Sequence, residues 1–262
     1  MKKFFLLILF CIFVLSNISF GIKKYEVLVS DYRGLFASAL YKSEGICSDF
    51  LYKFNSYFSF GASLNVILDI PIYGYSGYIE ESVQFWNAKI YGSFVDRDIL
   101  GFPLGTTVKF SYENILDYRE ISLSVDLYSL ANILDNISYF FIVENFNLGL
   151  YTTKYVQYKL LFDPVEFKFD IFYRFGDFKF LIGVLGSIDF EFFVVLPAVD
   201  LGLSYYFYPN FEVGVGNTFR VGNLLNLELF FDLLLEEYII RAKFGFGYIN
   251  GINGGMEFFV KI

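Results

Sequence analysis

A period-two alternation of apolar and polar residues constrains the fold of this chain more than any other feature. From residue 165 to 175, the odd positions are all apolar or aromatic. The even positions carry Glu166, Lys168, Asp170 and Arg174, with Phe172 as the exception. The same alternation recurs in 178–192, 198–208, 211–221, 225–233, 238–248 and 255–262. Successive side chains of a β-strand point to opposite faces, so the pattern predicts strands with one apolar and one polar face.

The charged residues of these seven segments all fall on the less apolar face. They are Glu166, Lys168, Asp170, Arg174, Lys179, Asp189, Glu191, Asp200, Glu212, Arg220, Glu228, Asp232, Arg241, Lys243, Glu257 and Lys261. All of them except Asp200 and Glu212 are our candidate lumen-lining residues. Glycines such as Gly214 and Gly216 share this face, as expected for a lumen face or a bend.

Turn-forming residues separate the segments, as at Asp163–Pro164, Gly176–Asp177 and 250–254. Counting back from Ile262, thirteen candidate strands reach residue 57, and a first strand within 24–41 makes fourteen. Bacterial barrels have an even number of strands, which fits this total. Twelve is the alternative count, because 137–162 is ambiguous.

The choice between a lipid-facing and a soluble β-structure depends on composition. Apolar residues make up 56% of the chain, aromatics 23%, and the mean hydropathy is +0.50. The uncharged run 4–15 is shorter than the roughly 20 residues of a spanning helix. Aromatics crowd near turns, as in 205–208, which is typical of membrane girdles. We therefore predict an all-β, antiparallel up-and-down transmembrane barrel embedded in lipid; a lipocalin-like barrel or a sandwich is the soluble alternative.

The first 21 residues have the three parts of an export signal. Lys2 and Lys3 precede the apolar run, and Ser19 and Gly21 occupy the −3 and −1 positions of a cleavage site. We expect cleavage after Gly21, which leaves residues 22–262 as one barrel domain in the outer membrane. The net charge would then change from −8 to −10, because the leader holds two lysines and no acid.

The last residues resemble the C-terminal strand that bacterial outer-membrane proteins present to their barrel assembly machinery. Met256, Phe258, Val260 and Ile262 share one face. The final residue in that class is usually Phe, and here it is Ile. The resemblance is to the porin-like barrel class and implies the lipid bilayer and the assembly machinery as partners. The scarcity of His and abundance of Phe, Tyr, Ile and Asn also resemble proteins of AT-rich genomes, including spirochaetes.

The chain lacks the residues of common catalytic and metal sites. It contains no His, so a Ser-His-Asp or Cys-His site is excluded, and we expect neither an enzyme nor a cofactor. Only Cys47, which we expect in a loop, remains after cleavage, so a zinc or copper site is not expected. Because the chain carries a net negative charge, we do not expect it to bind nucleic acid. We interpret Glu80–Glu81, Glu236–Glu237 and 96–98 as solvated loop residues.

Three functions remain open. Mixed charge around a lumen favours a passive channel for small polar solutes. The same residues could instead form salt bridges across a closed lumen, or line a lumen plugged by a loop, and neither of these would conduct. A surface adhesin or structural anchor would use longer loops, for which 43–56 and 96–102 are the candidates. A channel for hydrophobic solutes needs an apolar path, and aromatics on the polar face could supply one: Tyr128, Phe172, Tyr206, Phe230 and Phe259.

Overall fold

The described strands form one closed antiparallel barrel. The computed structural model describes residues 23–42, 45–73, 79–97, 102–115, 118–152, 159–161, 164–189, 194–208, 210–220, 226–247 and 251–261. Their elements are α2 (Lys23–Val29), β1 (Gly34–Lys42), β2 (Gly45–Lys53), β3 (Phe58–Tyr73), β4 (Ile79–Asp96), β5 (Leu104–Ile115), β6 (Tyr118–Leu134), β7 (Ile137–Thr152), β8 (Lys159–Leu161), β9 (Val165–Phe175), β10 (Phe178–Asp189), β11 (Val194–Tyr208), β12 (Phe211–Arg220), β13 (Asn226–Leu234), β14 (Tyr238–Gly247) and β15 (Gly251–Lys261).

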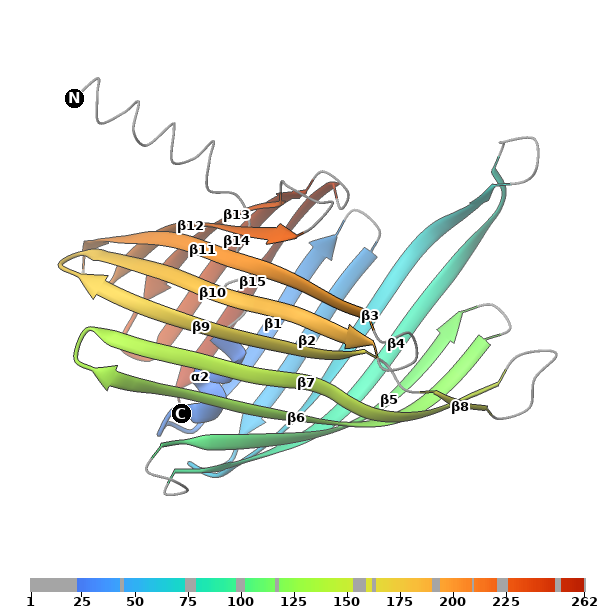
Figure 1. Ribbon diagram of the computed structural model, residues 1–262, viewed down its shortest axis with the longest axis horizontal. Coiled ribbons are helices and arrows are strands. Elements are labelled where there is room, and N and C mark those ends of the chain that lie inside the picture. Colours follow the sequence, from blue (N-terminus) through green and yellow to red (C-terminus); the bar gives the residue numbers. More distant parts are fainter. Residues whose placement is uncertain are drawn as a thin grey trace.

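Consecutive strands pair with each other, except that β9 pairs with β7 rather than with β8, and the first and last strands close the ring (Figure 1). Gly34 of β1 lies opposite Lys261 of β15, and the pairing continues to Tyr41 and Gly254. Strands β8 and β9 both pair with β7 in one register, because Leu161 lies opposite Gly149 and Glu166 opposite Glu144. They occupy one strand position, so the barrel has fourteen strands. The predicted fold class and the total of fourteen are confirmed.

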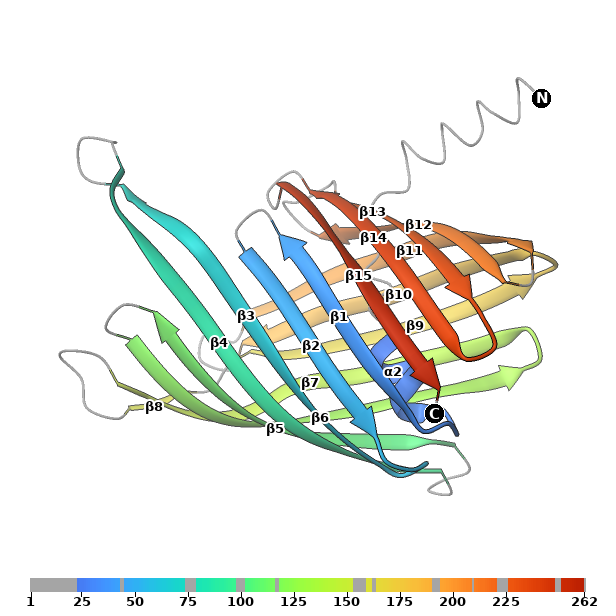
Figure 2. The same ribbon diagram turned by 180° about the vertical axis from the view of Figure 1, so that it is seen from behind.

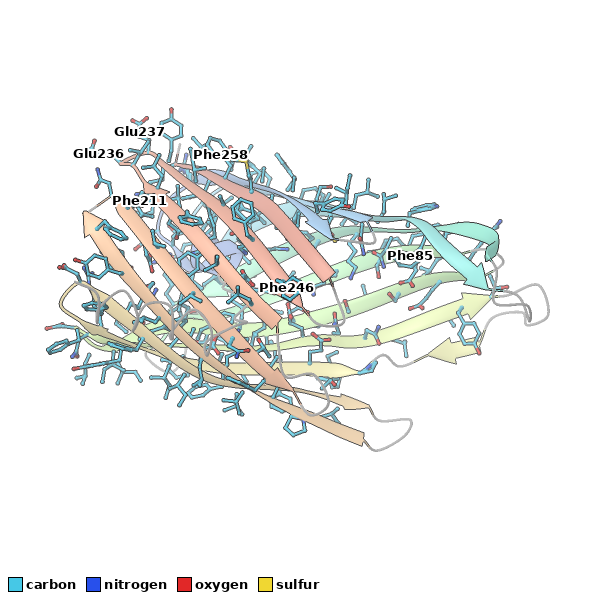
Figure 3. The ribbon with its side chains drawn as sticks, turned by 90° about the horizontal axis from the view of Figure 1, so that it is seen from above. Phe85, Phe211, Glu236, Glu237, Phe246 and Phe258 are labelled. Carbon is cyan, nitrogen blue, oxygen red and sulfur yellow. The ribbon has the colours of Figure 1, made fainter. Side chains whose placement is uncertain are left out.

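The outer surface is apolar and the inner surface carries the charge. On β10, the exposed fraction is 43% at Phe180 and 58% at Ile182, but only 4% at Leu181. Asp170 and Asp232, by contrast, are completely buried. Figure 3 shows side chains projecting along the outer wall, with Glu236 and Glu237 at the turn between β13 and β14. This inverted distribution is that of a barrel surrounded by lipid rather than water.

One irregularity bends the wall between β6 and β7. Val125 pairs with Phe146 and Leu127 with Val143, so Asp126 faces two residues of β7. Asn145 has a positive φ of 61°, a conformation that Asn adopts more readily than most residues. Its backbone N–H donates a 3.1 Å hydrogen bond to Oδ1 of Asp126. The bulge is thus held by a side chain of the opposite strand.

The N-terminal part of the barrel differs from the sequence prediction in its details. The first strand expected within 24–41 corresponds to β1 at 34–42, which follows α2 at 23–29. A second strand at 45–53 was missed, and the expectation of a loop at 43–56 is wrong. Cys47 lies in β2 rather than in a loop, and Glu80–Glu81 lie in β4 rather than in a turn. From residue 57 onward there are twelve strand positions instead of thirteen, so two errors cancelled in the total.

Helix α2 lies inside the barrel, near the end where the C-terminus is found (Figures 1 and 2). It packs against β1, β4 and β6. Both views show strands in front of it and behind it, so it crosses the interior rather than covering an outer face. No helix among the described residues is long and apolar enough to cross a membrane.

Candidate functional site

The interior wall from β9 to β12 holds a network of paired charges. Lys168 lies 3.2 Å from Asp170 and 2.7 Å from Asp200. Gly183 stands between the two aspartates in the strand order, and a Cβ there would lie 2.0 Å from Oδ1 of Asp170. Thr218 donates a 2.6 Å hydrogen bond to Asp200. The lysine is therefore shared between two carboxylates rather than left facing the lumen.

Two further ion pairs lie on the interior wall formed by β13, β14 and β15. Arg241 binds Asp232 through two nitrogens, at 2.5 and 2.6 Å, and its guanidinium lies 4.5 Å from the ring centre of Phe230. Lys243 pairs with Glu257 on the neighbouring strand. Bidentate Arg–carboxylate geometry is among the stronger forms of ion pair. These charges neutralise each other in pairs along the wall.

The remaining predicted lumen residues have more varied positions. Arg174, Lys179 and Lys261 lie over the rings of Tyr206, Phe172 and Tyr32. Glu166 is exposed near the start of β9, and Glu228 is half-buried on β13. Asp189 and Arg220 belong to β10 and β12, but their side chains lie outside the described residues, as does all of Glu191.

The predicted terminal signals are placed only in part. Ser19 and Gly21 of the expected cleavage site lie outside the described residues, as does Ile262. Met256 and Phe258 of β15 are exposed, and Val260 is half-buried. The outward side chains of β15 thus belong to the same apolar surface as those of β10.

Aromatic rings on the inner wall lie close to glycines of the adjacent strand. Rings of Tyr91, Tyr128, Phe230 and Phe259 lie within 3 Å of where a Cβ would stand on a facing glycine. These glycines are Gly61, Gly105, Gly214 and Gly34, respectively. The absence of a side chain is what allows such close approach. Three of the aromatics expected to supply an apolar path, Tyr128, Phe230 and Phe259, are therefore built into the wall.

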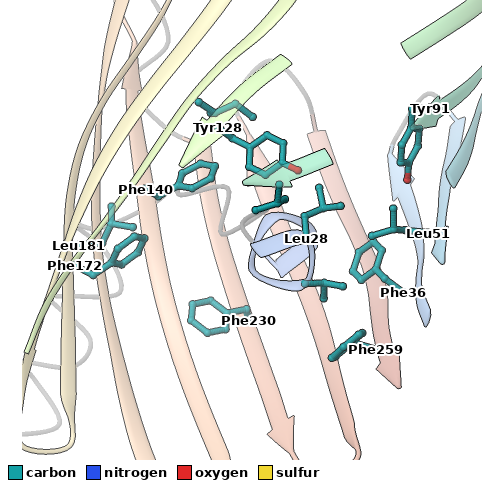
Figure 4. Packing of buried hydrophobic residues seen from close by; sticks show 13 residues of the cluster. Leu28, Phe36, Leu51, Tyr91, Tyr128, Phe140, Phe172, Leu181, Phe230 and Phe259 are labelled. Atoms are coloured by element: carbon teal, nitrogen blue, oxygen red, sulfur yellow. The ribbon is translucent and has the colours of Figure 1, made fainter. Parts of the chain in front are cut away.

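Helix α2 is bound to this wall by aromatic packing. Its Tyr25 ring lies 5.1 Å from Tyr128 and 5.4 Å from Phe140, between ring centres. The Tyr25 hydroxyl donates a hydrogen bond to Glu144, next to the β7 bulge. Leu28 is 1% exposed and stands within the buried cluster around the helix (Figure 4). The apolar interior and the helix therefore form one packing unit.

Two cations from the wall bind the C-terminal end of α2. Lys53 of β2 donates hydrogen bonds to the carbonyls of Val27, at 2.9 Å, Leu28, at 2.5 Å, and Ser30. Arg97 donates to the carbonyls of Val29 and Ser30 and pairs with Asp31. The last carbonyls of a helix have no partner within it and carry partial negative charge, so cations at this position stabilise it. Residue 97 is thus part of the interior site and not merely of a charged loop.

Burial of α2 also shifts two of its titratable groups. Desolvation lowers the pKa of the Lys24 ammonium, and its 2.8 Å ion pair with Asp49 opposes that shift. Desolvation, followed by the charge of Glu144, raises the pKa of the Tyr25 hydroxyl well above its ordinary value. Tyr25 therefore stays protonated and remains a donor to Glu144 at neutral pH.

Sequence reasoning missed α2 because its residues fit two patterns. Tyr25, Val27 and Val29 alternate as in a strand, while Tyr25, Leu28 and Val29 share one helical face. The barrel decides between the two, because β1 already pairs with β15 and leaves no free strand edge with which residues 23–29 could pair.

Two cavities adjoin α2. A cavity of about 180 Å³ lies beside its C-terminal end, with Val27, Phe36, Ile239 and Phe259 among its lining residues. A larger cavity of about 350 Å³ lies beside Lys24, and most of the residues that line it have polar or charged side chains. Phe36 and Glu257 line both, so the two cavities adjoin the same stretch of wall. Among the described residues, no group of three His, Cys, Asp or Glu side chains is placed to hold a metal ion.

Comparison of the whole fold finds transport barrels. The structure matches the Pseudomonas putida toluene transporter TodX with a TM-score of 0.61 and 9% identity, over 95% of this chain and 96% of that one. It matches the Ralstonia pickettii toluene transporter TbuX at 0.59 and 8%, over 90% of each. It matches the monoaromatic hydrocarbon channel CymD at 0.54 and 8%, over 88% of each. No protein family and no curated protein matches the sequence. At these identities the likeness establishes the outer-membrane barrel fold.

Proposed function

We propose that this protein is a passive outer-membrane channel for small organic molecules of largely apolar character, with α2 occluding the lumen in the resting state. The observation that carries the proposal is a helix bound inside a closed barrel with cavities adjoining it. A barrel that only anchors surface loops has no need of such a helix. Passive channels, in contrast, need a means of limiting leakage of other solutes.

The apolar character of the solute is inferred from the interior beside the helix. The smaller cavity is lined mainly by aliphatic and aromatic side chains. Wall charges elsewhere are largely paired, as Lys168 is with Asp200 and Arg241 with Asp232. Such pairs do not offer an open ring of charge to a hydrated ion. The names of the structural neighbours, which refer to toluene and monoaromatic hydrocarbons, agree with this solute class.

The orientation follows from the rules for bacterial barrels. The tight turns at 135–136, 176–177 and 235–237 lie at the end of the barrel where β1 begins and β15 ends. Short turns face the periplasm in such barrels, so α2 would lie near the periplasmic mouth. Cleavage after Gly21 would leave α2 one residue from the new N-terminus. The plug would then be a free chain end, able to leave the lumen without breaking the barrel.

A second candidate, a channel for small polar solutes, is favoured by the larger cavity. Serine, asparagine and lysine side chains make up much of its lining. In this case the apolar cluster would serve only to seat the helix.

Two measurements test the proposal. In planar bilayers, the complete mature protein should be closed most of the time, while a variant lacking 23–33 should conduct ions steadily. In cells with a lipopolysaccharide outer membrane, expression should speed uptake of radiolabelled toluene more than that of a sugar of similar mass. Steady conductance of the complete protein, or a selective gain for the sugar, would contradict the apolar-solute channel; the second result would support the polar alternative.

A further inference from the structure

The larger cavity contains one lysine that no acid neutralises. Lys24 and Lys243, which also line it, are paired with Asp49 and Glu257. Lys89 is half-buried, and within the described residues it makes no ion pair or hydrogen bond. In an interior where most charges are paired, an ammonium that borders a cavity is a site for a negative charge from outside the chain.

The strand register explains why Lys89 has no partner. It points inward from β4 between Ser63 on β3 and Ser111 on β5, neither of which carries charge. The nearest acid along this row is Asp49, two strands away, and it already binds Lys24 and accepts a hydrogen bond from Tyr91. The acid diagonal to Lys89 on β5 is Glu113, which lies opposite Asn87 and accepts a hydrogen bond from its amide rather than from Lys89. The residues directly beside the ammonium on the neighbouring strands are therefore uncharged serines.

A second polar atom points to an organic ligand rather than a bare ion. The Asn87 side chain lies on the same strand and lines the same cavity. Its amide nitrogen donates a 2.9 Å hydrogen bond to Glu113, but its Oδ1 is buried without a partner among the described residues. A buried acceptor without a donor is costly, and a hydroxyl on a bound molecule would satisfy it.

The apolar part of such a molecule has a place next to these groups. Phe36 and Leu40 line the same cavity, and Phe36 also lines the smaller cavity beside α2. We propose that the larger cavity binds small aromatic or aliphatic carboxylates, with the carboxylate on Lys89 and the apolar body toward Phe36. This inference rests on the proposed channel function and adds organic anions with an apolar body to its solutes.

Cys47 provides a direct measure of occupancy. Its thiol lines the cavity and donates a 3.0 Å hydrogen bond to Asn65. The experiment measures the rate at which N-ethylmaleimide alkylates Cys47 in the refolded protein, with Cys11 replaced by serine if it is still present. Benzoate is the charged probe, and benzamide is its uncharged counterpart of the same shape. Titration calorimetry at pH 7.5 gives the affinities independently.

We expect benzoate to slow alkylation at concentrations about tenfold lower than benzamide does, since a hydrogen bond to a charged group is worth about 1.5–3 kcal/mol and 1.4 kcal/mol is tenfold. Lys89→Gln should weaken benzoate about tenfold and leave benzamide unchanged, while Lys89→Arg should retain benzoate binding. Lys179→Gln, which alters a lysine over the Phe172 ring, is the matched control and should change neither affinity. Heat-modifiable gel mobility verifies that each variant is folded.

The outcomes separate this inference from the channel itself. Equal affinities for benzoate and benzamide, with no effect of Lys89→Gln, would overturn the carboxylate site while leaving a channel for neutral aromatics intact. Failure of both compounds to bind or to protect Cys47 would overturn the inference and the apolar-solute channel together.

Discussion

Replacing Lys53 with methionine should release α2 from the lumen. Methionine keeps much of the aliphatic length but cannot donate to the carbonyls of Val27, Leu28 and Ser30, which the Lys53 ammonium binds in the structure. Lys53 is 1% exposed, so its charge lies in the interior only because these carbonyls compensate it. The side chain contacts the helix and not the strand ladder, so the barrel itself should remain intact.

The size of the effect follows from those bonds. Hydrogen bonds to charged groups contribute about 1.5–3 kcal/mol each. When the helix leaves the wall, water hydrates the Lys53 ammonium and offsets part of that loss, so the net contribution of the three bonds to docking is close to that of one bond. A loss of about 2–3 kcal/mol corresponds to a shift of about 30- to 150-fold in the ratio of open to closed channel.

Single-channel recording in planar bilayers measures that ratio directly. Lys53→Met should raise the ratio of open to closed time by this factor. Arg97→Met, which removes the second cation at the same helix end, should raise the ratio as well. Lys179→Met is the control. An open fraction for Lys53→Met within twofold of the unaltered protein would refute the idea that these carbonyl contacts hold the plug.

Three further substitutions test the wall, each by urea midpoint in phospholipid. Gly214→Ala should destabilise the barrel by about 1–3 kcal/mol, because the new Cβ would stand 2.0 Å from the Phe230 ring; no loss would show that the ring moves freely. Asp232→Leu should cost about 3–5 kcal/mol by removing the carboxylate that binds the buried Arg241 guanidinium, and adding Arg241→Met should restore most of it; a further loss in the double variant would contradict the pairing argument. Val184→Arg should cost about 2–4 kcal/mol if that position faces acyl chains, whereas a neutral effect would place it in water.

The outward face was predictable because lipid imposes one simple requirement on it. Every second residue of a spanning strand must be apolar, so β9, β10 and β14 show their two faces directly in the sequence. The even strand number then follows from both ends of the chain lying on one side.

The alternation fails where the helix binds, and this explains the errors near the N-terminus. Leu51 on β2 and Phe36 on β1 point inward and are almost fully buried in the cluster around α2. The inner wall beside the helix mixes such apolar residues with the polar partners Asp49 and Lys53, so the inward face of β2 is not uniformly polar and its alternation is hard to recognise. Ser48 on the outward phase of β2 weakens the pattern further.

The interior partners were beyond sequence reasoning because they depend on register. Lys168 and Asp200 are separated by 32 residues and meet across the interior face of β10. Period two indicates only that both point inward, and a two-residue change of register would give each a different neighbour. The unpaired state of Lys89 could not be foreseen for the same reason.

Lipid exposure along β10 decides whether the apolar face of the barrel lies against acyl chains. Spin labels would be placed singly at Ile182 and Leu181 in bilayer-embedded protein, and their collision rates with oxygen and with a water-soluble nickel chelate would be measured. We expect high oxygen and low nickel accessibility at Ile182, whose side chain is 58% exposed, and low oxygen accessibility at Leu181, which is 4% exposed. Ready access of the nickel chelate to Ile182, or equal oxygen accessibility at the two positions, would contradict an inverted barrel embedded in lipid.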